Sequence, residues 1–280
     1  MAKLSRKKKK IIYNVTMIIL FLVFVSCAIY LFKYFWESKK SEEKVDELKE
    51  LIVEEEPYVE PEYNDESTVT DAKKEEYTIP YVDVDGVSVQ KKFVEIYKRN
   101  NDFVGWLLIQ DTPIDYPVMQ SMYDEEYYIH KDFDKEYSTA GTLFVDTESD
   151  LLEPSDNIVI YGHNMKTGKM FNCLLDYEDE EFYKEHKYIQ FNTIHGNNTY
   201  EIIAAFRTKI YAKDYNGFKY YKFFDADKEE EFMNYVNNCK NLTGYDIPTT
   251  ANYGDKLITL STCAYHTKNG RFVVVAKKIK

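Results

Sequence analysis

An uncharged segment of 22 residues, Ile11–Phe32, lies near the start of the chain and follows a strongly basic stretch. A helix of that length rises roughly 33 Å, which is enough to cross the hydrocarbon core of a bilayer. Aromatic side chains near its far end, at Tyr30, Tyr34, Phe35 and Trp36, suit a membrane–water interface. The segment therefore predicts a transmembrane anchor.

This anchor predicts a single-pass protein of the cell membrane. The positive-inside rule places the basic residues 1–10 in the cytoplasm, residues 11–36 in the membrane and the rest of the chain outside the cell. A cleaved signal peptide is the alternative, because Val25-Ser26-Cys27 is similar to a lipoprotein cleavage site. Its apolar core would be unusually long and would continue past that site, so we favour the uncleaved anchor.

The chain beyond the basic tail is strongly acidic. The net charge is −12 overall, and the first ten residues carry six positive charges, so the remainder carries −18. Such a surface binds phosphate backbones poorly, and we expect no nucleic-acid partner. Residues 37–76 are rich in Glu, Lys and Asp and predict an acidic linker. The spacing of Val45, Leu48, Leu51 and Ile52 indicates a short helix early in that linker.

Residues 77–280 have the composition of a globular domain and are numerous enough for one core. At the start of this domain, the apolar residues of Ser88–Asn100 recur at helical spacing and predict a helix. Eight segments rich in β-branched and aromatic residues predict strands: Val104–Gln110, Asp115–Gln120, Thr142–Asp146, Asn157–His163, Tyr188–Thr193, Thr199–Ile210, Lys256–Cys263 and Arg271–Ile279. Further helices are expected at Lys169–Tyr177, Glu180–His186 and Asp227–Lys240. The pattern predicts a mainly β fold, a closed eight-stranded β-barrel with peripheral helices.

The four cysteines are Cys27, Cys173, Cys239 and Cys263, and they form neither a CxxC pair nor a framework of regular spacings. A disulfide between Cys173 and Cys239 is a minor alternative for a domain outside the cytoplasm. Cys263 and His266 alone have the spacing of zinc ligands, and the acidic residues are spread along the chain. We expect neither a metal site nor a cofactor.

Three reactive side chains stand at the ends of predicted strands. Cys263 ends one strand, Arg271 opens the next after a loop, and His163 ends the strand that starts at Asn157. If the loop closes a hairpin, the thiol and the guanidinium lie within side-chain reach at one edge of the sheet. A thiol, an imidazole and a guanidinium held together can carry out acyl transfer, with the thiol as nucleophile and the guanidinium opposite the developing oxyanion.

Each of these residues also has a simpler structural interpretation. Cys263 alone would be a small buried apolar residue, His163 a ring bonded to a backbone carbonyl, and Arg271 a charge at a strand end. His266 is an alternative base because it follows the cysteine by three residues, although that offset usually points away from a strand end. The remaining histidines have polar neighbours and are expected to be exposed: His130, His186 and His195.

The order and spacing of these motifs resemble those of the sortases, the membrane-anchored cysteine transpeptidases of Gram-positive bacteria. The matching segments are Thr259–Cys263, Arg271–Val274 and Tyr161–Met165. Class B sortases are the most similar, since their first strands and the segment after their histidine resemble Asn101–Leu107, Ile114–Val118 and Gly168–Phe171. The resemblance extends from about Ser88 to the C-terminus.

The resemblance implies that Cys263 is the nucleophile, that His163 is the general acid and base, and that Arg271 holds the substrate carbonyl or the oxyanion. The implied substrate is a secreted protein with a C-terminal sorting signal of the Pro-x-Thr type, cleaved after its Thr through a thioester. The acyl group then passes to a peptidoglycan amine, which anchors the protein to the cell wall. Ser261 and Thr262 are the expected substrate-binding positions.

Three alternatives stay open at this point. A pilin-polymerising sortase would use the same three residues with a lysine of another protein as acceptor. A membrane-bound cysteine peptidase would resolve the acyl-enzyme with water. An extracellular binding module would keep the anchor and the barrel but would not need the cysteine, histidine and arginine together.

Overall fold

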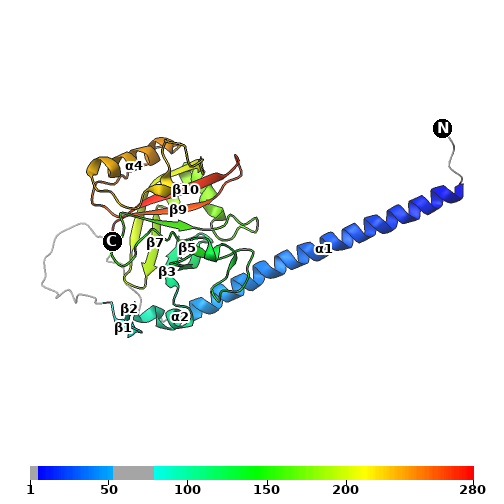
Figure 1. The fold of residues 1–280 in the computed structure, drawn as a ribbon, viewed down its shortest axis with the longest axis horizontal. Coiled ribbons are helices and arrows are strands. Elements are labelled where there is room, and N and C mark those ends of the chain that lie inside the picture. The colour runs from blue at the N-terminus through cyan, green and yellow to red at the C-terminus, as the bar shows by residue number, and fades with distance from the viewer. Residues whose placement is uncertain (1–5, 53–78) are drawn as a thin grey trace. The chain divides into compact units, whose positions relative to one another are not determined.

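Eight strands close into a barrel, which confirms the predicted fold class. The computed structural model describes residues 6–52 and 79–280. The barrel strands are β3 (Phe103–Leu108), β4 (Asp115–Met119), β5 (Leu143–Val145), β6 (Asn157–Tyr161), β7 (Tyr188–Thr193), β8 (Thr199–Lys209), β9 (Leu257–Cys263) and β10 (Gly270–Lys278). Their order around the barrel is β10-β8-β7-β3-β4-β5-β6-β9, and β9 pairs with β10 to close it (Figure 1).

Two of the strand pairs are parallel, and one of them positions the candidate site. β6 runs parallel to β9, with Tyr161 opposite Ser261, although the two strands are about a hundred residues apart in the sequence. β10 is antiparallel to β9, with Arg271 opposite Cys263. The C-terminal ends of β6 and β9 and the first residues of β10 therefore lie at the same rim of the barrel.

Alternate residues of the strands enter two different apolar clusters, as the pleat of a strand requires. The barrel interior is filled by one set, exemplified by Ile160, Leu260 and Val274, which are all fully buried. The other set faces outward on one side, where β8, β9 and β10 are covered by the helix α4 (Glu229–Leu242). Figure 1 shows α4 along this side of the barrel.

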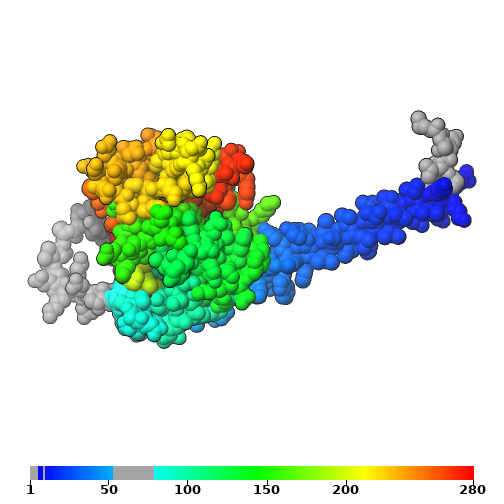
Figure 2. Space-filling view, in the orientation of Figure 1, coloured from blue at the N-terminus to red at the C-terminus, as the bar shows by residue number. Residues whose placement is uncertain are grey.

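The helix α4 is built to cover a sheet. Phe232, Tyr235, Val236 and Cys239 recur at helical spacing, and all four are buried against the outer face of the strands. Three Glu residues occupy its first turn and a Lys its last, which favours the helix dipole at both ends. In the space-filling view the later part of the chain, which includes α4, gathers on one side of the barrel unit (Figure 2).

A third apolar cluster lies under the segment that leads into the barrel. The hairpin β1 (Tyr81–Val84) and β2 (Val87–Gln90) turns at Asp85-Gly86, where both residues have positive φ. A 3-10 helix η1 (Lys91–Phe93) and the helix α2 (Val94–Arg99) follow. The predicted helix Ser88–Asn100 is therefore wrong over its first residues, because the Asp-Gly turn pairs them into β2.

The N-terminal helix α1 (Arg6–Glu50) is long and apolar enough to cross a membrane, on length and composition alone. The stretch predicted as a linker is thus helical as far as Glu50, and the predicted spacer beyond Ile52 falls outside the described residues. The chain divides into two compact units, and the boundary lies inside α1, after Lys44. The end of α1 from Val45 onward therefore belongs to the barrel unit.

Apolar and charged contacts hold this end of α1 against the barrel unit. Leu48 is fully buried in the third cluster, and Val45, Leu51 and Ile52 pack around it. The Lys49 ammonium lies 2.8 Å from a carboxylate oxygen of Asp115 on β4.

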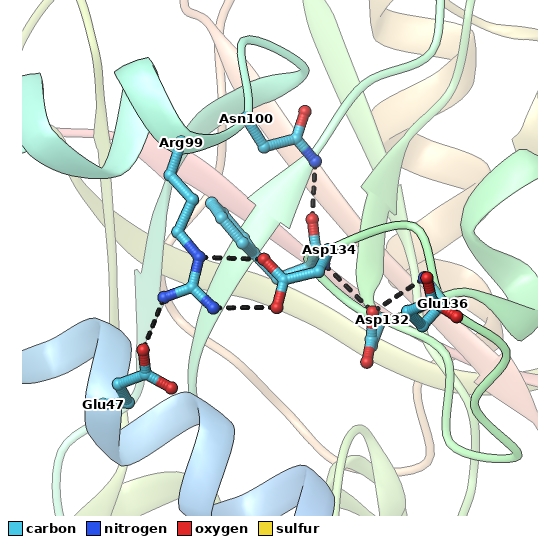
Figure 3. Close-up of polar contacts among 7 residues, drawn as sticks. Glu47, Arg99, Asn100, Asp132, Asp134 and Glu136 are labelled. Carbon is cyan, nitrogen blue, oxygen red and sulfur yellow. Dashed lines mark hydrogen bonds and ion pairs between the residues drawn. The ribbon is translucent and has the colours of Figure 1, made fainter.

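Figure 3 shows how Arg99 connects the end of α1 to the barrel unit. Its guanidinium binds Asp134 in bidentate fashion at 2.8 and 2.7 Å and reaches Glu47 of α1 at 2.7 Å. One side chain of α2 therefore ties α1 to the loop that contains Asp134.

Four short helices complete the described chain: η2 (Tyr127–His130), η3 (Asn172–Glu178), α3 (Glu180–Glu185) and η4 (Tyr220–Lys222). The helix predicted at Lys169–Tyr177 is wrong at its start, because Gly168 and Met170 have positive φ in a tight loop and the 3-10 helix begins only at Asn172. The alternative of a disulfide is also wrong. Cys173 and Cys239 are both free and are buried in different clusters.

Candidate active site

Cys263 and Arg271 face each other across the ladder between β9 and β10. They are direct register partners at the rim of the barrel, and both side chains are half-buried. Directly opposed residues of an antiparallel pair have Cβ atoms about 5 Å apart and point to the same face. The hairpin that the sequence predicted therefore brings the thiol and the guanidinium together.

His163 follows the end of β6 by two residues, beside the end of β9. Gly162 N–H donates to the carbonyl of Ser261 at 3.2 Å, and the Thr262 hydroxyl donates to the carbonyl of Gly162 at 2.7 Å. These bonds continue the β6–β9 pairing past Tyr161 and bring His163 level with Cys263. Gly162 itself is required by packing, because a Cβ there would lie 2.4 Å from the Leu143 side chain.

Contacts from the last two residues of η2 hold the His163 ring. Its Nε2 lies 2.7 Å from the carbonyl oxygen of Ile129, and the His130 ring stacks on it with centroids 5.3 Å apart and planes 22° apart. Because a carbonyl only accepts, Nε2 carries a hydrogen and Nδ1 is left to exchange a proton. Burial lowers the pKa of His163, with a smaller lowering from the charge of His130, while the bond to Ile129 opposes both. The neutral imidazole is therefore favoured.

Asn164 connects the histidine side to the nucleophile side. Its Nδ2 donates to the backbone carbonyl of Cys263 at 2.8 Å, and its Oδ1 accepts from Asn172 Nδ2 at 2.6 Å. Because both amides are fixed by these bonds, the segment after His163 is tied to the end of β9. Sequence reasoning gave Asn164 no role, although it directly follows the histidine.

Ser261 and Thr262 lie beneath the site. Each has a nearly fully buried side chain, and the Ser261 hydroxyl lies 2.7 Å from the hydroxyl of the buried Tyr220. Thr262 bonds to Gly162, as described above. A side-chain contact from either residue to a substrate would need a buried hydroxyl to leave its present partner. Substrate binding by these two residues stays a prediction.

Tyr220 is a residue of the site that the sequence did not reveal. It comes from η4, far from β9 in the sequence, and lies within electrostatic range of Cys263 and Arg271. Burial raises the pKa of Tyr220 well above its ordinary value, so its hydroxyl stays protonated beside Ser261.

The other candidates for site chemistry are His266, a metal site and a second reactive cysteine, and none of them has the arrangement seen at the rim. His266 is exposed in the turn between β9 and β10, whereas the His163 ring is fixed by two contacts. Among residues 6–52 and 79–280, no group of three His, Cys, Asp or Glu side chains converges as metal ligands would. Burial raises the pKa of the Cys173 thiol to about 11, which leaves that cysteine unreactive at neutral pH.

The rim therefore holds the parts that covalent acyl transfer requires. A half-buried thiol stands opposite a permanent cation, and an imidazole with one free nitrogen lies on the adjacent strand end. A thiolate can attack a carbonyl, the guanidinium can stabilise the oxyanion that forms, and the imidazole can move the proton.

Comparisons with known proteins agree with this chemistry. The model of the Sortase domain family matches residues 107–279, a range that includes the rim. Sortase B of Staphylococcus aureus is 31% identical over 194 residues, which cover 69% of this chain and 76% of the relative. Sortase B of Listeria monocytogenes is 33% identical over 216 residues, which cover 76% of this chain and 84% of the relative.

Solved structures of sortase B match the barrel as well. The Staphylococcus aureus sortase B–substrate complex has a TM-score of 0.62 at 30% identity and covers 69% of this chain and 86% of its own. A structure of sortase B complexed with triglycine has a TM-score of 0.60 at 31% identity, over 68% of this chain and 86% of its own.

Proposed function

Because this chain belongs to the sortase family and is a class B sortase, a cysteine transpeptidase that anchors or processes surface proteins, we propose that Cys263, His163 and Arg271 are its catalytic residues. The pairing of Cys263 with Arg271 across β9 and β10, with His163 level with them at the end of β6, carries this proposal. No other cysteine of the described chain combines partial exposure with a facing cation at the rim.

In the proposed first step, Nδ1 of neutral His163 takes the proton of the Cys263 thiol as the sulfur attacks the carbonyl carbon of the Thr in a Pro-x-Thr sorting signal. Electron density moves to the carbonyl oxygen, and the Arg271 guanidinium stabilises the resulting oxyanion. The tetrahedral intermediate collapses as the C–N bond breaks, and His163 donates a proton to the departing amine. The products are a thioester on Cys263 and a free C-terminal peptide.

In the second step an amine resolves the thioester. His163, now neutral, accepts a proton from the incoming amine, whose nitrogen attacks the thioester carbonyl. The C–S bond breaks, a new amide forms, and the departing sulfur takes the proton from His163, so that Cys263 returns as a thiol and His163 as a neutral ring. We propose a peptidoglycan amine as the acceptor, and the relative solved with triglycine supports a short glycine peptide as a first test amine.

The apolar helix α1 supports an anchor in the cell membrane. We propose that the chain crosses the membrane once, with the basic residues 1–10 inside the cell and the barrel unit outside it. A secreted substrate would then meet the rim on the side where peptidoglycan is assembled.

Transpeptidation is tested with the full chain in detergent micelles. A panel of quenched fluorescent peptides with Pro-x-Thr cores is incubated with and without triglycine, and the products are identified by mass spectrometry. We expect cleavage after Thr and a product capped with triglycine, both abolished by Cys263→Ala. Hydrolysis that ignores triglycine would favour the peptidase instead. Transfer only to a lysine side chain of a second protein would favour pilin polymerisation.

A further inference from the structure

The imidazole of His130 lies directly against the imidazole of His163. The two rings are 5.3 Å apart between centroids with only 22° between their planes, so one face of His163 is covered by His130. The ring of Tyr137 also lies near His130, with centroids 6.2 Å apart. His130 is therefore close to the rings of both exposed Tyr137 and the candidate general acid.

The backbone around His130 is fixed from both directions. Ser138 N–H donates to the carbonyl of His130 at 3.0 Å, and Lys131 pairs with Tyr137 in a bridge that closes the loop between them. The Thr142 hydroxyl donates to the carbonyl of Lys131 at 2.9 Å. The backbone entropy of His130 is therefore already lost in the fold, and stacking costs only the rotamer freedom of its side chain.

Hydrogen bonds and an ion pair also hold the loop that follows His130. Asp132 accepts hydrogen bonds from the backbone N–H groups of Asp134 and Glu136, and Asp134 is held by Arg99 (Figure 3). Lys135 forms an ion pair with Asp102 at 2.8 Å. The segment that follows His130 is therefore held by a network of its own.

The same short segment contacts His163 twice. Ile129 supplies the carbonyl that accepts from Nε2, and the next residue supplies the stacked ring. One contact fixes which nitrogen carries a hydrogen, and the other fixes the plane of the ring. Together they direct Nδ1 of His163 to a single orientation at the rim.

We propose that His130 is a positioning residue for His163, and that the proton on His130 regulates how readily His163 takes up its own. This proposal rests on the proposed role of His163. Two imidazoles in contact resist carrying positive charge together, so positive charge on His130 disfavours the charged form of His163. Among the nearby ionisable groups, Tyr137 lies beside His130, Lys131 follows His130 in the chain, and Cys263 and Arg271 stand at the adjacent strand ends.

Of the two imidazoles, that of His130 is the one exposed to solvent. Its side chain is exposed, whereas His163 is half-buried. The Lys131 ammonium is directed away, to the carbonyl of Lys135 at 3.1 Å and over the ring of Tyr127. The lowering of the His163 pKa by the charge of His130 agrees with the ring geometry.

The deciding measurement is an NMR titration of the full chain in micelles, with histidine labelled at Cε1. His163→Ala identifies the His163 signal, and His130→Phe and His130→Gln both remove the neighbouring charge. We expect His163 to titrate at higher pH in both variants than in the wild type, because a like charge is gone. His195→Phe is the matched control and leaves the titration unchanged. An unchanged His163 midpoint in both His130 variants overturns the regulatory part.

Kinetics test the positioning part with the peptide and triglycine. Since displacement of a catalytic group is costly, we expect His130→Gln to lose about tenfold in kcat/KM, and His130→Phe, which keeps a ring, to lose less. Wild-type kcat/KM in His130→Gln overturns positioning. Full activity of His163→Ala would instead overturn the proposed function, and the NMR titration would still decide whether the two rings are coupled.

Discussion

Cys263 and Arg271 are held by a strand ladder, whereas the His163 ring is held by contacts from the short helix η2. The first pair faces across β9 and β10, at the end of a ladder of seven paired residues. His163 lies past the last paired residue of β6 and depends on Ile129, His130 and the segment after it. The nucleophile side therefore tolerates change in the surrounding loops, and the histidine side is where small changes should be felt.

The largest effect should come from the nucleophile itself. Cys263→Ala removes the atom that forms the thioester, and we expect at least about a 10⁴-fold loss of kcat. The measurement is single-turnover cleavage with mass detection of the acyl-enzyme. Cys239→Ser is the matched variant, because it changes an equally free but buried thiol. It should form the acyl-enzyme normally, and loss of that intermediate in Cys239→Ser alone would contradict the assignment.

Arg271→Lys tests whether the second member of the ladder acts through its charge or its planar fork. A lysine keeps the charge but loses the fixed geometry, so we expect about a 100-fold loss of kcat/KM with little change in thermal midpoint. Arg271→Ala should lose more. Equal activity of Arg271→Lys and wild type would show that the cation alone is sufficient.

Asn164→Ala breaks a side-chain bridge between the two sides. The variant loses a hydrogen bond to the carbonyl of Cys263, and a bond of this kind contributes about 1 kcal/mol. We expect a decrease of roughly three- to tenfold in kcat/KM, measured with the peptide and triglycine. Asn238→Ala, a half-exposed helical Asn whose bonds stay within its own helix, provides the control. If both variants behave alike, the bridge does not couple the two sides.

Arg99→Met tests whether the ion pairs of Arg99 stabilise the loop that follows His130. The variant removes the bidentate bond to Asp134 and the contact to Glu47, which together contribute up to about 1 kcal/mol. We expect a thermal midpoint lower by about 2–4 °C and a smaller decrease in activity. Lys98→Met removes a neighbouring exposed ion pair and should change neither quantity. An unaltered midpoint in Arg99→Met would show that the loop is held without Arg99.

The smallest effect should be the pH dependence of stability. Because the pKa of His163 is lowered in the folded chain, the unfolded chain binds this proton first as the pH falls below about 6.5. The contribution of the neutral ring is present above that pH and is lost on acidification. His163→Phe lacks this loss, so its thermal midpoint should fall less between about pH 7 and pH 5 than that of the wild type. Parallel midpoints would contradict the burial of His163.

The contrast between the strand ladder of Cys263 and Arg271 and the contacts of His163 also explains which parts of the site the sequence could predict. The strand ending at Cys263 and the strand beginning near Arg271 were placed to within a residue, because apolar runs and an Asn-Gly turn leave a local signal. The parallel pairing of β6 with β9 was not visible, and only the resemblance connected His163 to Cys263. Ring stacking by His130 and the position of Tyr220 depend on η2 and η4, two 3-10 helices that are too short to leave a periodic signal in the sequence.

The end of α1 is joined to the rest of the barrel unit twice, by the chain between residues 53 and 78 and by the contacts of Glu47, Leu48 and Lys49. A nick in the covalent connection would therefore give two polypeptides that remain associated. Fragment complementation follows as a consequence: a peptide ending after Ile52 should recruit a separately produced barrel beginning near Tyr81. Release of the enzyme would then require dissociation as well as proteolysis.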